Sequence, residues 1–245
     1  MNEIVRVTDK PVKVIDALRC EMAKEARRLS GALHDWSASS VETLASAVAA
    51  AELMVATPEY EALVGALQAA FAPASVTDIK RELGVLFACY PAKDIDIGVL
   101  VACAVDEVIG EQPTMLELLV SVRRIRRTCK FRPSIAEIIE ALDDAGSAMV
   151  KAKEIVALPK RLNEAASGLQ RMATIKMDEV KELLSNRERR LDGGKNVDWY
   201  DVQLKNVRSK LADVLTHRVT ALEPLRPLIA QSITITKNEA VRTPW

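Results

Sequence analysis

Residues 114–138 read TMLELLVSVRRIRRTCKFRPSIAEI, and this stretch contains two helix starts separated by a basic segment, residues 123–132. Thr114 and Glu117 have the spacing of a capping box, in which a side-chain oxygen and a carboxylate bind the free amide groups of a helix start. Ser134 begins a second example of the same spacing. The stretch therefore predicts one helix after Thr114 that ends in the basic segment, and another helix after Ser134.

The composition of the whole chain also favours helices. Its 245 residues include only 9 glycines and 10 prolines, and aromatic residues make up 4%. β-Sheets usually require more β-branched and aromatic residues and more turns. We therefore expect an all-α fold, with a multi-helix front domain over residues 1–146. The apolar segment from Ile97 to Ile109 is expected to be a helix of this domain that is buried on several sides.

Beyond this domain, the apolar pattern becomes that of long helices. Apolar residues from Ile155 to Met172 alternate steps of three and four, which is the period of a coiled-coil seam. Residues 192–197, DGGKNV, are the strongest turn signal in the sequence. We expect a long antiparallel coiled-coil-like helical hairpin over residues 147–230, with its turn at 192–197, and a flexible tail over residues 231–245. Half of the hairpin's apolar stripe is exposed unless it packs on the front domain or on another chain.

The basic segment is the main candidate binding site. In a helix, the steps of four and three between Arg123, Arg127 and Lys130 place these side chains on one face. Such a concentration of cations predicts a surface for a negative partner, either DNA phosphates or an acidic protein. A solvated face with local pairing to Glu117 or Glu137 is the alternative interpretation. The candidate DNA- or partner-binding residues are Arg123, Arg124, Arg126, Arg127, Lys130 and Arg132.

Trp199 and Tyr200 directly follow the predicted turn of the hairpin. Because aromatic residues dominate the binding energy of protein interfaces, this pair is a candidate partner-binding site at the hairpin tip. The alternative is that the two rings only staple the start of the second hairpin helix.

No pattern in the sequence predicts catalysis. There is no phosphate-binding loop, no metalloprotease motif and no C-x-x-C pair, and the chain has only two histidines. The four cysteines, Cys20, Cys89, Cys103 and Cys129, are expected to be small core residues in a reducing cytosol. We therefore expect no enzyme, no metal and no cofactor. The absence of a signal-peptide pattern and of a long uninterrupted apolar segment predicts a cytoplasmic protein that does not enter a membrane.

Two motifs carry a resemblance to a known family. They are Leu83-x-x-Leu86-Phe87-x-x-Tyr90-Pro91 and Lys130-Phe131-Arg132-Pro133-Ser134-Ile135-Ala136-Glu137-Ile138. Through them, residues 78–145 resemble the small all-helical domain of the replicative helicase loaders and inhibitors that some double-stranded DNA phages encode. The chain departs from that family in three ways. About seventy residues precede the domain, its middle helix lacks a tryptophan, and the family's flexible C-terminal segment is replaced by the predicted hairpin.

The resemblance implies a non-enzymatic DNA-replication adaptor, encoded by a phage or prophage, that loads or restrains a hexameric replicative helicase in the bacterial cytoplasm. In that role the hairpin and tail would engage the helicase, while the basic segment would contact DNA or an origin-binding protein. The alternative is a structural, oligomer-forming helical phage protein, such as a scaffold or assembly factor, that self-associates through the hairpin. A plain DNA-binding protein is a third possibility.

Overall fold

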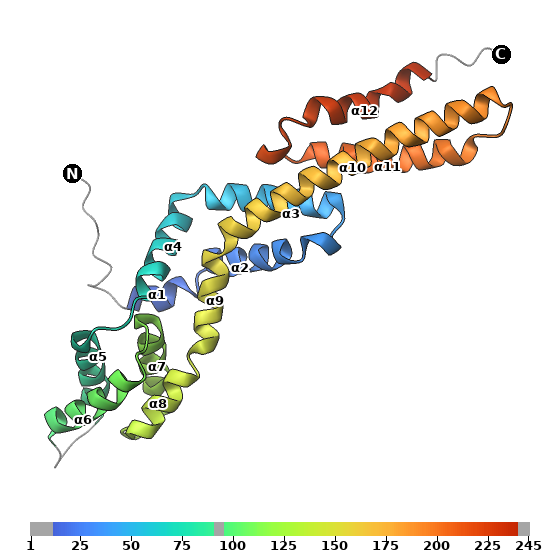
Figure 1. Ribbon diagram of the computed structural model, residues 1–245. Helices are drawn as coiled ribbons and strands as arrows, with labels where there is room; N and C mark the ends of the chain where they lie inside the picture. The colour runs from blue at the N-terminus through green and yellow to red at the C-terminus, as the bar shows by residue number, and fades with distance from the viewer. Residues whose placement is uncertain (1–11, 91–95, 240–245) are drawn as a thin grey trace, which may run out of the picture. The chain divides into compact units, whose positions relative to one another are not determined.

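The computed structural model describes residues 12–90 and 96–239 (Figure 1). Within these two ranges the regular structure is helical and no strand is formed, which confirms the predicted all-α fold. The α-helices are α1 (Val12–Ala17), α2 (Glu21–His34), α3 (Val41–Val55), α4 (Pro58–Ala70), α5 (Val76–Ala88), α6 (Ile97–Gly110), α7 (Met115–Thr128), α8 (Ile135–Asp143), α9 (Gly146–Val156), α10 (Leu158–Asp192), α11 (Asp198–Thr216) and α12 (Arg226–Glu239). Two short 3-10 helices are η2 (Trp36–Ala38) and η3 (Thr220–Leu222).

The two capping boxes predicted from residues 114–138 are both confirmed. At the start of α7, Thr114 Oγ1 accepts from the Glu117 amide at 3.2 Å, and Glu117 Oε2 accepts from the Thr114 amide at 2.8 Å. Ser134 and Glu137 form the same pair of bonds at the start of α8, at 3.3 and 2.7 Å. These reciprocal bonds satisfy amides that a helix start otherwise leaves without an acceptor.

The chain divides into two compact units that differ from the expected domains. Unit 1 holds the described residues up to Arg27 together with residues 57–157, and unit 2 holds residues 28–56 and those from 158 onward. The predicted boundary after residue 146 is therefore wrong, because α9 belongs to unit 1 and α3 belongs to unit 2. Which helices pack together depends on contacts between distant segments, and local periodicity carries no information about these contacts.

A single hydrophobic core joins α5, α6, α7 and α8 of unit 1. Leu83, Leu86 and Phe87 of α5 are almost fully buried in it. The hydroxyl of Tyr90, just after α5, donates to the carbonyls of Ile125 and Cys129, each at 3.3 Å, and so joins the end of α5 to the last turn of α7. Residues 78–90 and 96–145 thus form one packed helical assembly.

Burial of α6 is less extensive than its apolar sequence suggests. Ala104, Val105 and Val108 are buried against the core, but Val99 is 58% exposed and Ile109 is partly exposed. The expectation that this helix is buried on several sides is wrong, because its main contacts are with α5 and α8 on one side.

In unit 2 the longest helix, α10, contacts α3, α11 and α12 (Figure 1). Leu158, Leu162, Ala165 and Leu169 are buried along it at the predicted three- and four-residue steps. The buried residues of α3 are all aliphatic and include two alanines; they are Val41, Leu44, Ala45, Val48 and Ala51. The apolar stripe of α10 is therefore covered within unit 2. The long helix begins at Leu158, not at residue 147, and coiled-coil packing between α10 and α11 stays a prediction.

Part of the predicted flexible tail is helical. Of residues 231–245, those up to Glu239 belong to α12, and residues 240–245 lie outside the described residues. Pro227 is the second residue of this helix, where its missing amide hydrogen removes no helical hydrogen bond. Ile229 anchors the helix because it is fully buried.

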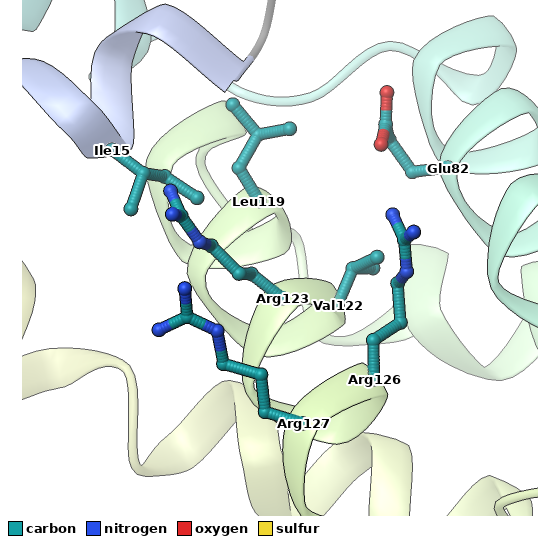
Figure 2. A pocket seen from close by; sticks show the side chains of 7 residues that line it. All are labelled: Ile15, Glu82, Leu119, Val122, Arg123, Arg126 and Arg127. Atoms are coloured by element: carbon teal, nitrogen blue, oxygen red, sulfur yellow. The ribbon is translucent and has the colours of Figure 1, made fainter.

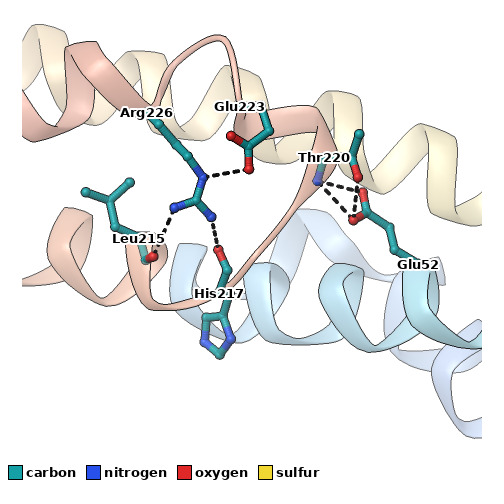
Figure 3. Close-up of polar contacts among 6 residues, drawn as sticks. All are labelled: Glu52, Leu215, His217, Thr220, Glu223 and Arg226. Atoms are coloured by element: carbon teal, nitrogen blue, oxygen red, sulfur yellow. Dashed lines mark hydrogen bonds and ion pairs between the residues drawn. The ribbon is translucent and has the colours of Figure 1, made fainter.

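Two charged side chains hold the loop between α11 and α12 (Figure 3). Glu52 of α3 accepts from the Thr220 amide at 2.9 and 3.1 Å and from the Thr220 hydroxyl at 3.1 Å. Arg226 donates to the carbonyls of Leu215 at 3.3 Å and His217 at 2.5 Å, and its Nε forms an ion pair with Glu223 at 3.0 Å. The carbonyls at the end of α11 thereby gain donors that the helix itself cannot supply.

Candidate partner-binding site

Three of the predicted cations line one pocket in unit 1 (Figure 2). Arg123, Arg126 and Arg127 occupy neighbouring positions on the same side of α7, as residues three and four apart do in any helix. The pocket has a volume of about 400 Å³. We call these three residues the pocket arginines. The other lining residues are Ile15, Glu82, Leu119 and Val122.

The pocket has an apolar wall beside its cationic one. Leu119 and Val122 come from α7, and Ile15 comes from α1. In Figure 2 the Arg123 side chain extends toward Ile15, while Arg126 extends toward the α5 side, where Glu82 lies. The amphipathic pattern of α7 explains this arrangement. Its buried positions pack on the core, and the arginines emerge at the edge of that packed face.

Two arginines of the basic segment are neutralised within unit 1. Arg123 forms an ion pair with Asp16 of α1 at 2.7 Å, and Arg124 forms one with Asp144 at 2.5 Å. The predicted partners were Glu117 and Glu137, but both of these serve the capping boxes instead. For Glu137, hydrogen bonds from the backbone and side chain of Ser134 lower the pKa of the carboxyl, so it stays ionised in this role.

Arg126 and Arg127 differ from these two. Both are exposed at the pocket, and neither forms an ion pair or a hydrogen bond with the residues that the structure describes. Lys130 is exposed just beyond the end of α7, and Arg132 is half-buried in the following loop. The structure therefore brings together three of the six predicted residues. Arg124, Lys130 and Arg132 do not line the pocket.

The pocket also contains a buried acid that the sequence did not indicate. Glu82 of α5 is 8% exposed, and its Oε1 accepts from Arg81 Nε at 3.1 Å. Arg81 also pairs with Asp78 at 3.1 Å. Glu82 and Ile15 lie far from α7 in the sequence, and no local motif marks either of them. Their role emerges only when α1 and α5 pack beside α7.

At the hairpin tip the two aromatic residues have different surroundings. Their rings meet edge to face, with centroids 5.0 Å apart. Tyr200 is half-buried under the guanidinium of Arg190, which lies 5.9 Å from its ring centre. Trp199 is 62% exposed. Tyr200 therefore fits the interpretation of a staple at the start of α11, while Trp199 is available to a partner.

The cysteines are not the core residues that the sequence suggested. Cys20, Cys89 and Cys103 are exposed, whereas Cys129 is half-buried and packs against the core of α5, α6, α7 and α8. Among the described residues, no group of three or more histidine, cysteine or acidic side chains could hold a metal ion.

Across residues 12–90 and 96–239, no single helix combines the length and the apolarity needed to cross a membrane, and α3 with α4 meets these criteria only as a bent pair. Comparisons with known proteins add no family assignment. Neither a protein-family model, nor a curated protein, nor a solved structure matches this chain.

Proposed function

We propose that this chain is a non-enzymatic adaptor that binds another macromolecule through the pocket arginines of unit 1. The observation that carries the proposal is that Arg126 and Arg127 stand at the pocket without an ion pair to any residue that the structure describes. An exposed guanidinium group keeps all its donors in a planar, fork-like arrangement that suits oxygen anions. Two of them at one pocket give such an anion both charge and geometry.

The resemblance of residues 78–145 to phage helicase loaders suggests the process. We propose that the partner is a hexameric replicative helicase and that the chain loads or restrains it in a bacterial cytoplasm. The packed core of α5, α6, α7 and α8 supports this proposal, because it gives α7 a rigid base from which to present the arginines. An adaptor of this kind would favour one ring conformation through differential binding and would need no chemistry of its own.

Gel filtration with light scattering, on mixtures of the purified full chain and a purified bacterial replicative helicase, tests the proposal. We expect a complex that is lost when Arg126→Glu and Arg127→Glu are combined. The matched control combines Lys80→Glu and Lys151→Glu, which makes the same charge change at exposed positions of unit 1 outside the pocket.

Three outcomes would count against the adaptor role. They are the absence of any complex, an equal loss of the complex in the control, and a large homo-oligomer of the chain alone that ignores the helicase. The last outcome would favour the structural or assembly protein.

A further inference from the structure

We infer that the pocket of unit 1 recognises an acidic protein segment in which an apolar side chain lies next to carboxylates, and that DNA is not its ligand. This inference rests on the proposed adaptor function and adds the chemical class of the partner's contact surface.

The shape of the pocket favours a protein side chain. A concavity of about 400 Å³ lies within the range of pockets that enclose compact ligands. Ile15, Leu119 and Val122 are only 4–7% exposed, and a leucine-like or phenylalanine-like group would cover the small apolar surface that they leave open at the pocket. A phosphate backbone presents no such group.

The charges at the pocket point in the same direction. Asp16 balances Arg123, and Arg81 holds Glu82, so the cations left for a ligand are Arg126 and Arg127. Two guanidinium groups match one or two carboxylates. DNA-binding proteins instead neutralise roughly 6–10 phosphates along an extended track.

Neighbouring features do not extend the pocket into a DNA track. Arg124 is occupied by Asp144, and neither Lys130 nor Arg132 lines the pocket. The cationic surface at the pocket is therefore short. It fits a local acidic and apolar motif of a protein better than a repeating polyanion.

Fluorescence anisotropy with the full chain tests this inference. The first probe is a labelled peptide of three Leu-Glu-Glu repeats, and the second replaces each leucine with serine at the same charge. The third and fourth probes are a single-stranded and a duplex DNA oligonucleotide. We expect the leucine peptide to bind at least about tenfold more tightly than the serine peptide and than either DNA.

The same measurement is then repeated on variants. Combining Arg126→Gln with Arg127→Gln should weaken the leucine peptide about tenfold or more, while Lys80→Gln with Lys151→Gln should leave it unchanged. Thermal melting followed by circular dichroism verifies that all variants are folded. Since Arg126 and Arg127 are exposed and without internal ion pairs among the described residues, both glutamine changes should preserve the fold.

The inference is wrong if DNA binds more tightly than the peptide and loses affinity in the pocket variant, or if the leucine and serine peptides bind equally. It is also wrong if no peptide binds. In each of these cases, the adaptor function is tested separately by the gel-filtration measurement of the complex with the helicase. A complex that still depends on Arg126 and Arg127 would retain the adaptor role with a different contact chemistry.

Discussion

Arginines are used differently in the two units of this chain. In unit 2, Arg226 binds two helix-end carbonyls, Arg187 pairs with Asp201 at 2.6 Å, and Arg171 lies 5.5 Å from the ring centre of Trp36. Each of these groups stabilises a contact between neighbouring segments. In unit 1, two arginines of the most basic stretch of the sequence remain exposed beside a pocket.

The difference shows that a count of charges does not identify a binding site. Residues 187–190 hold three arginines and Glu188. Two of these arginines, Arg187 and Arg190, are engaged by Asp201 and Tyr200. What distinguishes α7 is the number of its cations that form no ion pair with the residues that the structure describes. Two remain at the pocket, and both are held by the same helical turn.

The largest effect should come from the close packing of Gly168 against Trp36 in unit 2. A Cβ atom added at Gly168 would lie 2.6 Å from two carbons of the Trp36 ring, so Gly168→Ala must displace the tryptophan or the helix. We expect a loss of about 2–3 kcal/mol in the free energy of unfolding, as for other overpacked sites. Urea denaturation measures it.

The matched control for Gly168→Ala lies in unit 1. Gly65 is exposed in α4, and a Cβ atom there meets nothing within 4 Å. Gly65→Ala should therefore be neutral or stabilise by up to about 1 kcal/mol, through the better helix propensity of alanine. Equal effects of the two substitutions would mean that Trp36 does not close tightly on α10.

Next in size is a matched pair of arginine substitutions. Arg226→Met removes the donors to Leu215 and His217, so we expect a loss of about 2 kcal/mol in stability. Arg126→Met removes no internal bond among the described residues, and its cost should be within about 0.5 kcal/mol. Urea denaturation of both variants measures the difference. A costly Arg126→Met would show that this arginine is structural, and the comparison between the units would fail.

Much of the fold could be predicted from the sequence because its signals are local. Capping boxes involve residues three apart, so Thr114 and Ser134 were sufficient to place two helix starts. The division into units could not be predicted, because it depends on α3 packing against α10 across about a hundred residues of intervening chain. The helical part of the tail was not predicted, although Pro227 lies at the second position of α12, where proline is compatible with a helix start.

The site was predictable to a similar extent. Helical spacing predicted one face for Arg123, Arg127 and Lys130, and two of these residues line the pocket, where Arg126 joins them in place of Lys130. Their pairing was not predictable, because Asp16 and Asp144 come from other elements. Without those partners, the sequence could not separate Arg124, which is neutralised, from Arg126, which is not.

A smaller effect is expected for a buried hydroxyl of unit 1. Tyr60 is 2% exposed, and its hydroxyl donates to the Ile155 carbonyl at 2.7 Å. Tyr60→Phe should cost about 1 kcal/mol at neutral pH. The control is Tyr200→Phe in unit 2, which should change stability little, because the Tyr200 hydroxyl forms no hydrogen bond within the described residues.

The pH dependence of the Tyr60 variant adds a signed test. Burial raises the pKa of Tyr60 from 10.0 to about 12, so the folded state favours the neutral phenol. The stabilisation that the neutral Tyr60 phenol gives to the folded state is fully present below pH 10, and it is lost as the pH rises toward 12. Between neutral pH and pH 11, the free energy of unfolding of the wild type should fall by about 1 kcal/mol more than that of Tyr60→Phe. The stabilities of the two proteins should therefore converge. A gap that stays constant with pH would contradict a buried, hydrogen-bonded Tyr60.

The smallest effect on stability is expected at the hairpin tip. A substitution there tests whether unit 2 also contributes a partner-binding surface. Trp199 and Val202 lie three residues apart on α11, and both are more than half exposed. Trp199→Ala should therefore cost only about 0.5 kcal/mol, the low end for an aromatic edge-to-face pair. Tyr200→Ala should cost more, because it also removes the ring that Arg190 covers. If Trp199→Ala weakens the helicase complex without loss of stability, the chain binds through an apolar tip in unit 2 as well as a cationic pocket in unit 1. If the complex is unchanged, Trp199 takes no part in binding. A ring that also contributes little to folding would then have neither of the two roles predicted for it.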